Sequence, residues 1–255
     1  MRVLEIAEEG VSIEKLRAYE IEEARNLQQA MVPKEPIREE RFEIAHRFRP
    51  AASVGGDFLD YFYLEDGTVG FYLGDVVGKG LPAALYAALA VGTFRGIHKS
   101  GEKPVRVMEL LNRRLRMRQV PGRFCSVQYA VLEPAKRLLH IVNAGLPFPL
   151  HISKGGCRPL AGGGIPAGMF EDTTYAGNTI QLAAGDTVIF LTDGLSEARS
   201  PDDVEFGHEP LLSICEHQRH GRTEEVLDAV FNAWEEFVGS YPQHDDIAVA
   251  ALKVF

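Results

Sequence analysis

The order in which strands and helices follow one another is the feature of this sequence that most constrains its fold. Strand patterns occur in runs, bounded by Gly, Pro, Asp and Asn, whereas helical patterns occur in pairs. The predicted strands cover residues 42–49, 57–64, 68–76, 124–132, 138–143, 149–153, 179–183, 187–192 and 247–254. The predicted helix pairs cover residues 82–99 with 104–119, and 209–219 with 223–239. Because strands and helices do not alternate strictly, the sequence predicts an α+β fold with antiparallel sheets.

The N-terminal part of the chain differs in composition from the rest. Residues 11–32 are rich in Glu, Arg, Gln, Ala and Leu, and the pattern stops at Pro33. At about 100° per residue, an apolar stripe runs along this predicted helix, comprising Ile13, Leu16, Ile21, Ala24, Leu27 and Met31. Arg17 and Glu20 fall inside the stripe and disfavour a regular coiled coil. We therefore divide the chain into an N-terminal helical segment, residues 1–34, and one main domain, residues 35–255.

Charge and cysteine content exclude several classes of protein. With 27 basic and 36 acidic residues the net charge is −9, which argues against a broad nucleic-acid-binding surface. We find no apolar run near the roughly 20 residues that span a bilayer, and acidic residues stand where a signal peptide would be apolar. Cys125, Cys157 and Cys215 are scattered and form no C-x-x-C pair. We therefore expect reduced thiols in a cytoplasmic protein, without a zinc site.

Acidic residues recur where a predicted strand meets a turn. They lie in Gly55-Gly56-Asp57, Gly74-Asp75-Val76-Val77-Gly78-Lys79-Gly80, Thr192-Asp193-Gly194 and His244-Asp245-Asp246. Any one of these taken alone is more simply explained as a structural turn. Taken together, they supply the oxygen ligands that Mg²⁺ and Mn²⁺ prefer. Two such ions about 3.5–4 Å apart can activate a water for in-line attack on phosphorus, so no Ser, Cys or His nucleophile is needed.

Five ordered motifs give the sequence a family resemblance. They are Gly55-Gly56-Asp57-Phe58; Gly74-Asp75-Val76 with Gly78-Lys79-Gly80-Leu81-Pro82-Ala83-Ala84-Leu85; Asn143-Ala144-Gly145; Thr192-Asp193-Gly194-Leu195-Ser196-Glu197-Ala198; and Gln243-His244-Asp245-Asp246-Ile247. In this order they resemble bacterial type 2C (PPM) metal-dependent serine/threonine phosphatases, in the SpoIIE-like branch that regulates sigma factors. The segment Leu27-Gln28-Gln29-Ala30-Met31-Val32-Pro33 also resembles the helix that precedes this domain in its members. The resemblance covers residues 23–255.

The resemblance implies a fold and a site. The fold is two packed antiparallel β-sheets flanked by helices, an αββα sandwich, preceded by the linker helix. Two ions, Mn²⁺ or Mg²⁺, would be held by the carboxylates of Asp57, Asp75, Asp193 and Asp245 and by the backbone carbonyl of Val76. Asp246 is their neighbour or an alternate ligand. Asp57, Asp75, Asp193 and Asp245 are thereby the expected catalytic residues.

Two positions depart from the family pattern. Leu146 stands where many relatives carry His, and Ala248 stands where Thr is usual. Neither position is a ligand in the carried-over site. Lys79 lies near the expected site, and the group that protonates the leaving oxygen is unassigned. Arg47 and Arg49 are equally consistent with steering a phosphate and with salt bridges on a strand surface.

The function implied by the resemblance is hydrolysis of phosphoserine or phosphothreonine on a protein. In this branch the substrate is usually a phosphorylated antagonist of an anti-sigma factor, within a partner-switching pathway. Two alternatives stay open: a non-catalytic partner-binding module of the same fold, and a metal-dependent phosphodiesterase for small molecules. The retained acids argue against the first, since clustered carboxylates repel one another without a cation. We also expect a homodimer formed through the N-terminal helix, with no nucleic-acid partner and no membrane span.

Overall fold

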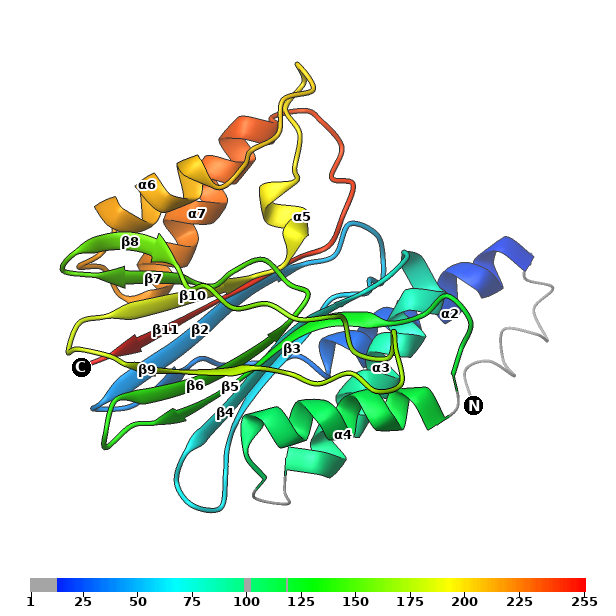
Figure 1. Ribbon diagram of the computed structural model, residues 1–255. Helices are drawn as coiled ribbons and strands as arrows, with labels where there is room; N and C mark the ends of the chain where they lie inside the picture. The colour runs from blue at the N-terminus through cyan, green and yellow to red at the C-terminus, as the bar shows by residue number, and fades with distance from the viewer. Residues whose placement is uncertain (1–12, 99–101, 118) are drawn as a thin grey trace.

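Two antiparallel sheets pack face to face, and helices cover the outer face of each (Figure 1). The computed structural model describes residues 13–98, 102–117 and 119–255. The first sheet has the order β1-β2-β11-β10-β7-β8, with β1 (Ile37–Arg38), β2 (Phe42–Arg49), β7 (Leu150–Ser153), β8 (Gly156–Pro159), β10 (Thr187–Leu191) and β11 (Ile247–Val254). The second has the order β3-β4-β5-β6-β9, with β3 (Phe58–Tyr63), β4 (Val69–Val76), β5 (Cys125–Glu133), β6 (Leu138–Ala144) and β9 (Gly177–Gln181).

The predicted fold class is confirmed, and three short elements join those expected from the sequence. These are the edge strands β1 and β8 and the four-residue helix α5 (Asp193–Ser196). The remaining helices are α2 (Ile13–Gln29), α3 (Gly80–Ile97), α4 (Pro104–Met117), α6 (Glu209–His217) and α7 (Thr223–Val238). The two edge strands had no clear sequence signal, because two to four residues are too few to display an alternating pattern.

Strand alternation divides the apolar residues among three layers. In β4, Val69, Phe71 and Leu73 point between the sheets, whereas Tyr72 points outwards to α3 and α4. In β11, even-numbered residues such as Ala250 line the space between the sheets, and odd-numbered ones pack beneath α6 and α7. Because successive side chains of a strand point to opposite faces, a strand buried on both faces sends alternate apolar residues to two different layers.

Helix α3 is unusually apolar for a helix on the outside of a sheet. Among the described residues it is the one helix long and apolar enough to cross a membrane by length and composition alone. This qualifies the expectation that no apolar run approached that length. Its inner residues, including Ala87, Ala90 and Phe94, are fully buried against the second sheet. Alanines on this face let the helix approach the strands closely.

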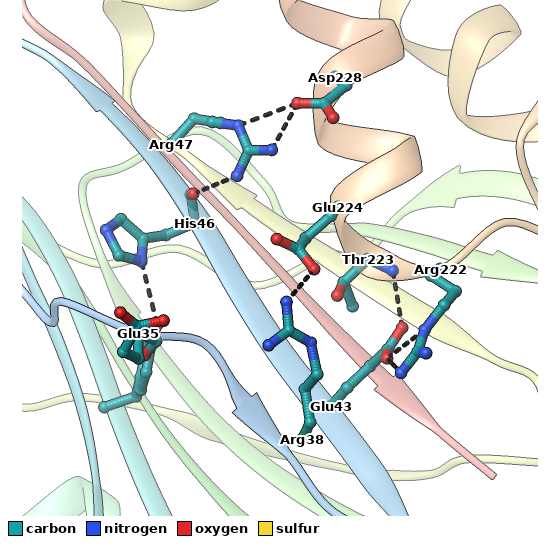
Figure 2. Close-up of polar contacts among 10 residues, drawn as sticks. Glu35, Arg38, Glu43, His46, Arg47, Arg222, Thr223, Glu224 and Asp228 are labelled. Carbon is teal, nitrogen blue, oxygen red and sulfur yellow. Dashed lines mark hydrogen bonds and ion pairs between the residues drawn. The ribbon is translucent and has the colours of Figure 1, made fainter.

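A row of polar contacts attaches α7 to the outer faces of β1 and β2 (Figure 2). Figure 2 shows Arg38 paired with Glu224 and Arg47 paired with Asp228. At the end of β2, Arg49 Nη1 lies 2.6 Å from Glu235 Oε1 on α7. Of the two interpretations of Arg47 and Arg49, the structure therefore supports salt bridging between strand and helix.

The N-terminal helix α2 contributes one buried residue, Gln28. Of the predicted apolar stripe, Leu16, Ile21, Ala24 and Met31 are half-buried, whereas Ile13 and Leu27 are 71% and 70% exposed. Packing on the body of the same chain therefore leaves only Ile13 and Leu27 of the stripe largely uncovered. The part of the prediction that concerns residues 11 and 12 lies outside the described residues.

Candidate metal centre

Strand parity brings acidic side chains from distant segments to one end of the space between the sheets. Asp75 shares the inward face of β4 with Phe71 and Leu73. Asp57 stands just before β3, two residues from Leu59, which points between the sheets. Asp246 stands just before β11, two residues from Ala248, which also points between the sheets. Because side chains two residues apart point the same way, these three acids converge. Asp193 and Asp245 have the opposite parity and lie at the rim of the site.

Asp57 is the most enclosed of the acids, with 2% of its surface exposed. The hydroxyl of Thr192 donates a hydrogen bond to Asp57 Oδ2 at 2.8 Å. The same hydroxyl accepts a hydrogen bond from the Ala248 amide at 3.0 Å, which fixes its orientation. Burial, followed by the charges of Asp75 and Asp246, raises the pKa of Asp57 well above its ordinary value. An ionised Asp57 is therefore unfavourable here unless a cation accompanies it.

Asp75 lies close enough to Asp57 for each carboxyl group to shift the pKa of the other. Burial and then the charges of Asp193 and Asp245 raise the pKa of Asp75 to about 7. The backbone carbonyl of Val76 lies beside this pair and faces Gly56. A β-carbon on Gly56 would stand 2.8 Å from that carbonyl oxygen and 3.3 Å from Asp75 Oδ1. Glycine at this position keeps both oxygens free of crowding.

Asp246 anchors the loop that carries Asp57. Its two carboxylate oxygens accept backbone hydrogen bonds, Oδ1 from the Ala51 amide at 2.8 Å and Oδ2 from the Gly56 amide at 2.6 Å. Two glycines make room for this residue: a β-carbon on Gly55 would lie 2.0 Å from Asp246 Oδ2, and one on Gly194 would lie 2.0 Å from the Asp246 carbonyl oxygen. These contacts hold the Asp246 carboxylate against the loop that precedes Asp57.

Lys79 closes the rim of the site. Its ammonium group lies 3.0 Å from Asp245 Oδ2 and donates a hydrogen bond to the His244 carbonyl. Burial and the charge of Asp245 raise the pKa of Asp193, and Lys79 partly offsets this effect. A cavity of about 470 Å³ adjoins this rim. Its lining includes Lys79, Gly194, Arg199, Tyr241, His244 and Asp245.

The donor chemistry of the cluster fits hard divalent cations. It gathers carboxylates and a carbonyl, with one ammonium group at the rim, so negative charge is in excess. In the described part of the chain, no three acidic, histidine or cysteine side chains already converge as the ligands of a bound ion do. The carboxylates nevertheless lie close enough to raise one another's pKa values. The roles of the six expected metal-site residues remain predictions.

Two residues of the site were not identified from the sequence. Thr192 belongs to a recognised motif. Val188 and Phe190 point between the sheets, and the same alternation could have shown that Thr192, two residues after Phe190, points towards the acids. Gln28 is a polar residue next to the apolar stripe of α2. Its side-chain amide binds Gly55, in the loop that precedes Asp57. Nothing in the helix pattern indicates this contact.

The two departures from the family pattern are both core positions. Leu146 is 5% exposed and packs between the sheets, and its backbone amide and carbonyl bind the Asn143 side chain. Ala248 is fully buried, and its carbonyl accepts a hydrogen bond from the Thr192 amide at 3.0 Å. Ala248 thereby supports Thr192, the residue that binds Asp57, whereas Leu146 contributes to the core between the sheets.

Comparison with protein families gives a match over most of the chain. The family model described as stage II sporulation protein E (SpoIIE) matches residues 65–255. Protein IcfG of Synechocystis is 27% identical over 91% of this chain, but the chain spans only 41% of its length. The phosphoserine phosphatases RsbU and RsbP of Bacillus subtilis are 24% and 26% identical. These matches cover 92% and 70% of this chain, and 70% and 45% of the respective relatives.

Solved structures share the same architecture. The SiaA-PP2C domain of Pseudomonas aeruginosa superposes with a TM-score of 0.82, at 21% identity, over 95% of this chain and 98% of that domain. RsbX in complex with magnesium gives a TM-score of 0.64 at 16% identity, covering 87% of this chain and 99% of RsbX. The catalytic domain of the serine/threonine phosphatase PstP with two manganese ions gives 0.60 at 13% identity, covering 84% and 98%. At these identities the similarity establishes the fold.

Proposed function

The chain belongs to the SpoIIE family, and from this premise we propose that it is a metal-dependent protein phosphatase that hydrolyses phosphoserine or phosphothreonine. The observation that carries the proposal is the proximity of the Asp57 and Asp75 carboxyl groups at one end of the space between the sheets, with uncompensated negative charge around them. The names of RsbU and RsbP as phosphoserine phosphatases support the same reaction class.

Each residue of the cluster has a task in this proposal. Asp57, Asp75, Asp193 and Asp245, with the Val76 carbonyl, would hold two Mn²⁺ or Mg²⁺ ions. The ions would activate a water for attack and neutralise charge on the phosphoryl group. The metal-containing structures of RsbX and PstP, which share the fold, support the choice of these metals. The described side chains around the acids offer no competing thiolate nucleophile, because the pKa of buried Cys125 is raised by its burial.

The other residues position this machinery. Thr192 holds the Asp57 carboxylate in one orientation, and Asp246 fastens the preceding loop. Such groups behind the ligands fix their geometry before substrate arrives. Lys79 places a positive charge at the edge of the adjoining cavity, where a phosphoprotein segment would enter.

The finer parts of the proposal concern the biological setting. We expect the substrate to be a small phosphorylated antagonist of an anti-sigma factor in a bacterial partner-switching pathway. Residues 1–34 would form a regulatory and dimerisation helix ahead of a phosphatase domain at 35–255, in a cytoplasmic homodimer. The exposed apolar side chains of Ile13 and Leu27 on α2 support the dimer.

The decisive experiment measures phosphate release from a phosphoserine antagonist protein before and after removal of metal. We expect chelation with EDTA to abolish turnover and added Mn²⁺ to restore it. A bis-aryl phosphodiester and a nucleotide panel test the alternative activity on small molecules. Faster hydrolysis of the diester than of the phosphoprotein would reassign the enzyme to that class. No hydrolysis of any substrate in Mn²⁺ would favour a non-catalytic module, and full activity in metal-free protein would exclude the proposed chemistry.

A further inference from the structure

The packing of α6 against β8 brings together two cysteines that are far apart in the sequence. Cys157 lies on β8, the edge strand of the first sheet, and is half-buried. Cys215 lies on α6 and is fully buried. Both belong to the apolar cluster between this sheet and its helices. The neighbouring residues confirm the approach, since a β-carbon on Gly156 would lie 3.5 Å from Glu216 Oε1.

The two thiols lie close enough for each to shift the pKa of the other, and their surroundings differ. The hydrogen bond from Cys215 outweighs burial and the nearby Glu216 charge, and it lowers the pKa of Cys157. The same contact, together with burial, raises the pKa of Cys215. The accessible sulfur is thus the more readily ionised one, and the thiolate is the reactive form of cysteine. A buried thiol directly behind it is placed to react second.

We propose that Cys157 and Cys215 form a peroxide-sensitive dithiol, with Cys157 as the reacting residue and Cys215 as the residue that resolves it to a disulfide. The proposed oxidant is hydrogen peroxide or a small organic hydroperoxide. The Cys157 thiolate attacks one peroxide oxygen and the O–O bond breaks. Cys157 becomes a sulfenic acid, and the leaving hydroxide or alkoxide takes up a proton to become water or an alcohol.

The second step involves only the two cysteines. The Cys215 sulfur attacks the Cys157 sulfur, the S–O bond breaks, and a second water leaves with the Cys215 proton. Overall, two thiols lose two electrons and two protons while the peroxide is reduced. The product is a covalent link between β8 and α6. This inference does not depend on the phosphatase assignment.

Peptide mapping of the full chain after mild peroxide treatment tests the proposal. We expect a mass lower by two hydrogen atoms and a cross-linked peptide pair containing Cys157 and Cys215, reversed by a thiol reductant. Cys125 is fully buried and serves as the internal control, which should remain a thiol. The oxidised protein should melt several degrees higher, because the cross-link restricts the unfolded chain.

Two variants distinguish the roles of the sulfurs. Cys215→Ser should stop the reaction at a Cys157 sulfenic acid, which dimedone traps. Cys157→Ser, at a half-exposed edge position, should leave Cys215 unmodified. Two persistent thiols in the wild-type protein, or a linkage between Cys157 residues of two chains, would overturn the proposal. Oxidation of Cys157 beyond the sulfenic acid without any link to Cys215 would also overturn it. These readouts use mass alone, so they hold whatever the catalytic activity proves to be.

Discussion

The side-chain amide of Gln28 forms two hydrogen bonds with the backbone of Gly55. Its Nε2 donates to the Gly55 carbonyl at 2.7 Å, and its Oε1 accepts from the Gly55 amide at 3.0 Å. Gln28 belongs to α2, and Gly55 stands two residues before Asp57. The one buried residue among the described positions of the N-terminal helix therefore holds the loop that positions the most enclosed carboxylate.

Replacing Gln28 should impair the site without touching an acid. Gln28→Leu removes both hydrogen bonds and leaves the Gly55 amide and carbonyl unpaired in a buried position. We expect about a 10–100-fold loss of Mn²⁺ affinity or activity, the usual cost of losing a group that supports metal ligands. Calorimetric titration of Mn²⁺ measures this effect. Gln29→Leu is the matched control, because Gln29 is the next residue of α2 and its side chain is exposed. Equal Mn²⁺ affinity in both variants would show that the helix does not communicate with the site.

The exposed apolar residues Ile13 and Leu27 of α2 predict an oligomer. Deleting residues 1–32 should shift the mass in light scattering towards the monomer and should also alter the phosphatase rate. Leu27→Asp separates the two effects, since it places a charge on the exposed stripe while leaving Gln28 in place. We expect this variant to be monomeric with Mn²⁺ affinity unchanged. If truncation changes neither the mass nor the rate, the helix is only a tether.

Individual acids should be indispensable for turnover and dispensable for folding. Asp57→Asn or Asp193→Asn should lower the rate by at least about a thousandfold, by the scale of metal-ion and electrostatic catalysis. In chelator, Asp57→Asn should melt higher than wild type, because burial and the Asp75 charge make the ionised form unfavourable. Asp228→Asn, on α7, serves as the control and should retain normal turnover. Near-normal turnover of Asp193→Asn would remove that residue from the proposed ligands.

The Thr192 hydroxyl should matter through Asp57. Thr192→Val preserves shape but removes the donor to Asp57 Oδ2, and we expect about a 10–100-fold loss of Mn²⁺ affinity or kcat/KM. Thr187→Val, at the start of β10, is a close control. The Thr187 hydroxyl is equally buried and has no hydrogen-bond partner among the described residues. This control should fold with equal or greater stability. A similar loss in both variants would point to general strand packing.

Glu43 should make stability depend on pH in the acid range. Although burial raises the pKa of Glu43, hydrogen bonds from the Arg222 side chain and the Thr223 amide outweigh it and lower the pKa below the ordinary 4.5 (Figure 2). Folding therefore favours the ionised form. Its contribution is complete above about pH 4.5 and is lost as the pH falls through the lower folded-state value.

Glu43→Gln tests this linkage. The variant should lose about 1–3 kcal/mol in the free energy of unfolding at pH 7, the scale of a charged hydrogen bond to a buried group. The difference from wild type should shrink below pH 4.5 in urea denaturation. Glu224→Gln is the control, because its ion pair with Arg38 is exposed and should contribute much less. A difference that stays constant from pH 7 to strongly acidic pH would contradict the assignment.

The sequence by itself determined the fold class and the set of acids. In strands such as residues 68–76, inward-facing and outward-facing side chains alternate with a period of two residues. This pattern and the paired helical patterns are local signals that follow directly from backbone geometry. The Gly-Asp pairs were visible because each stands at the end of such a strand. Asp57, Asp75 and Asp246 then meet because their parity sends them to the same side of their strands.

Only the tertiary structure decided which groups form hydrogen bonds with the acids and which distant residues meet. Thr192 and Asp57 adjoin strands of different sheets, and Cys157 and Cys215 meet only when α6 packs on β8. Arg47 could be assigned to a salt bridge only after α7 was placed over β2. Periodicity reports which face of an element is buried, but not which distant element covers that face. That choice depends on packing between elements, and it carries the hydrogen bonds that complete the proposed site.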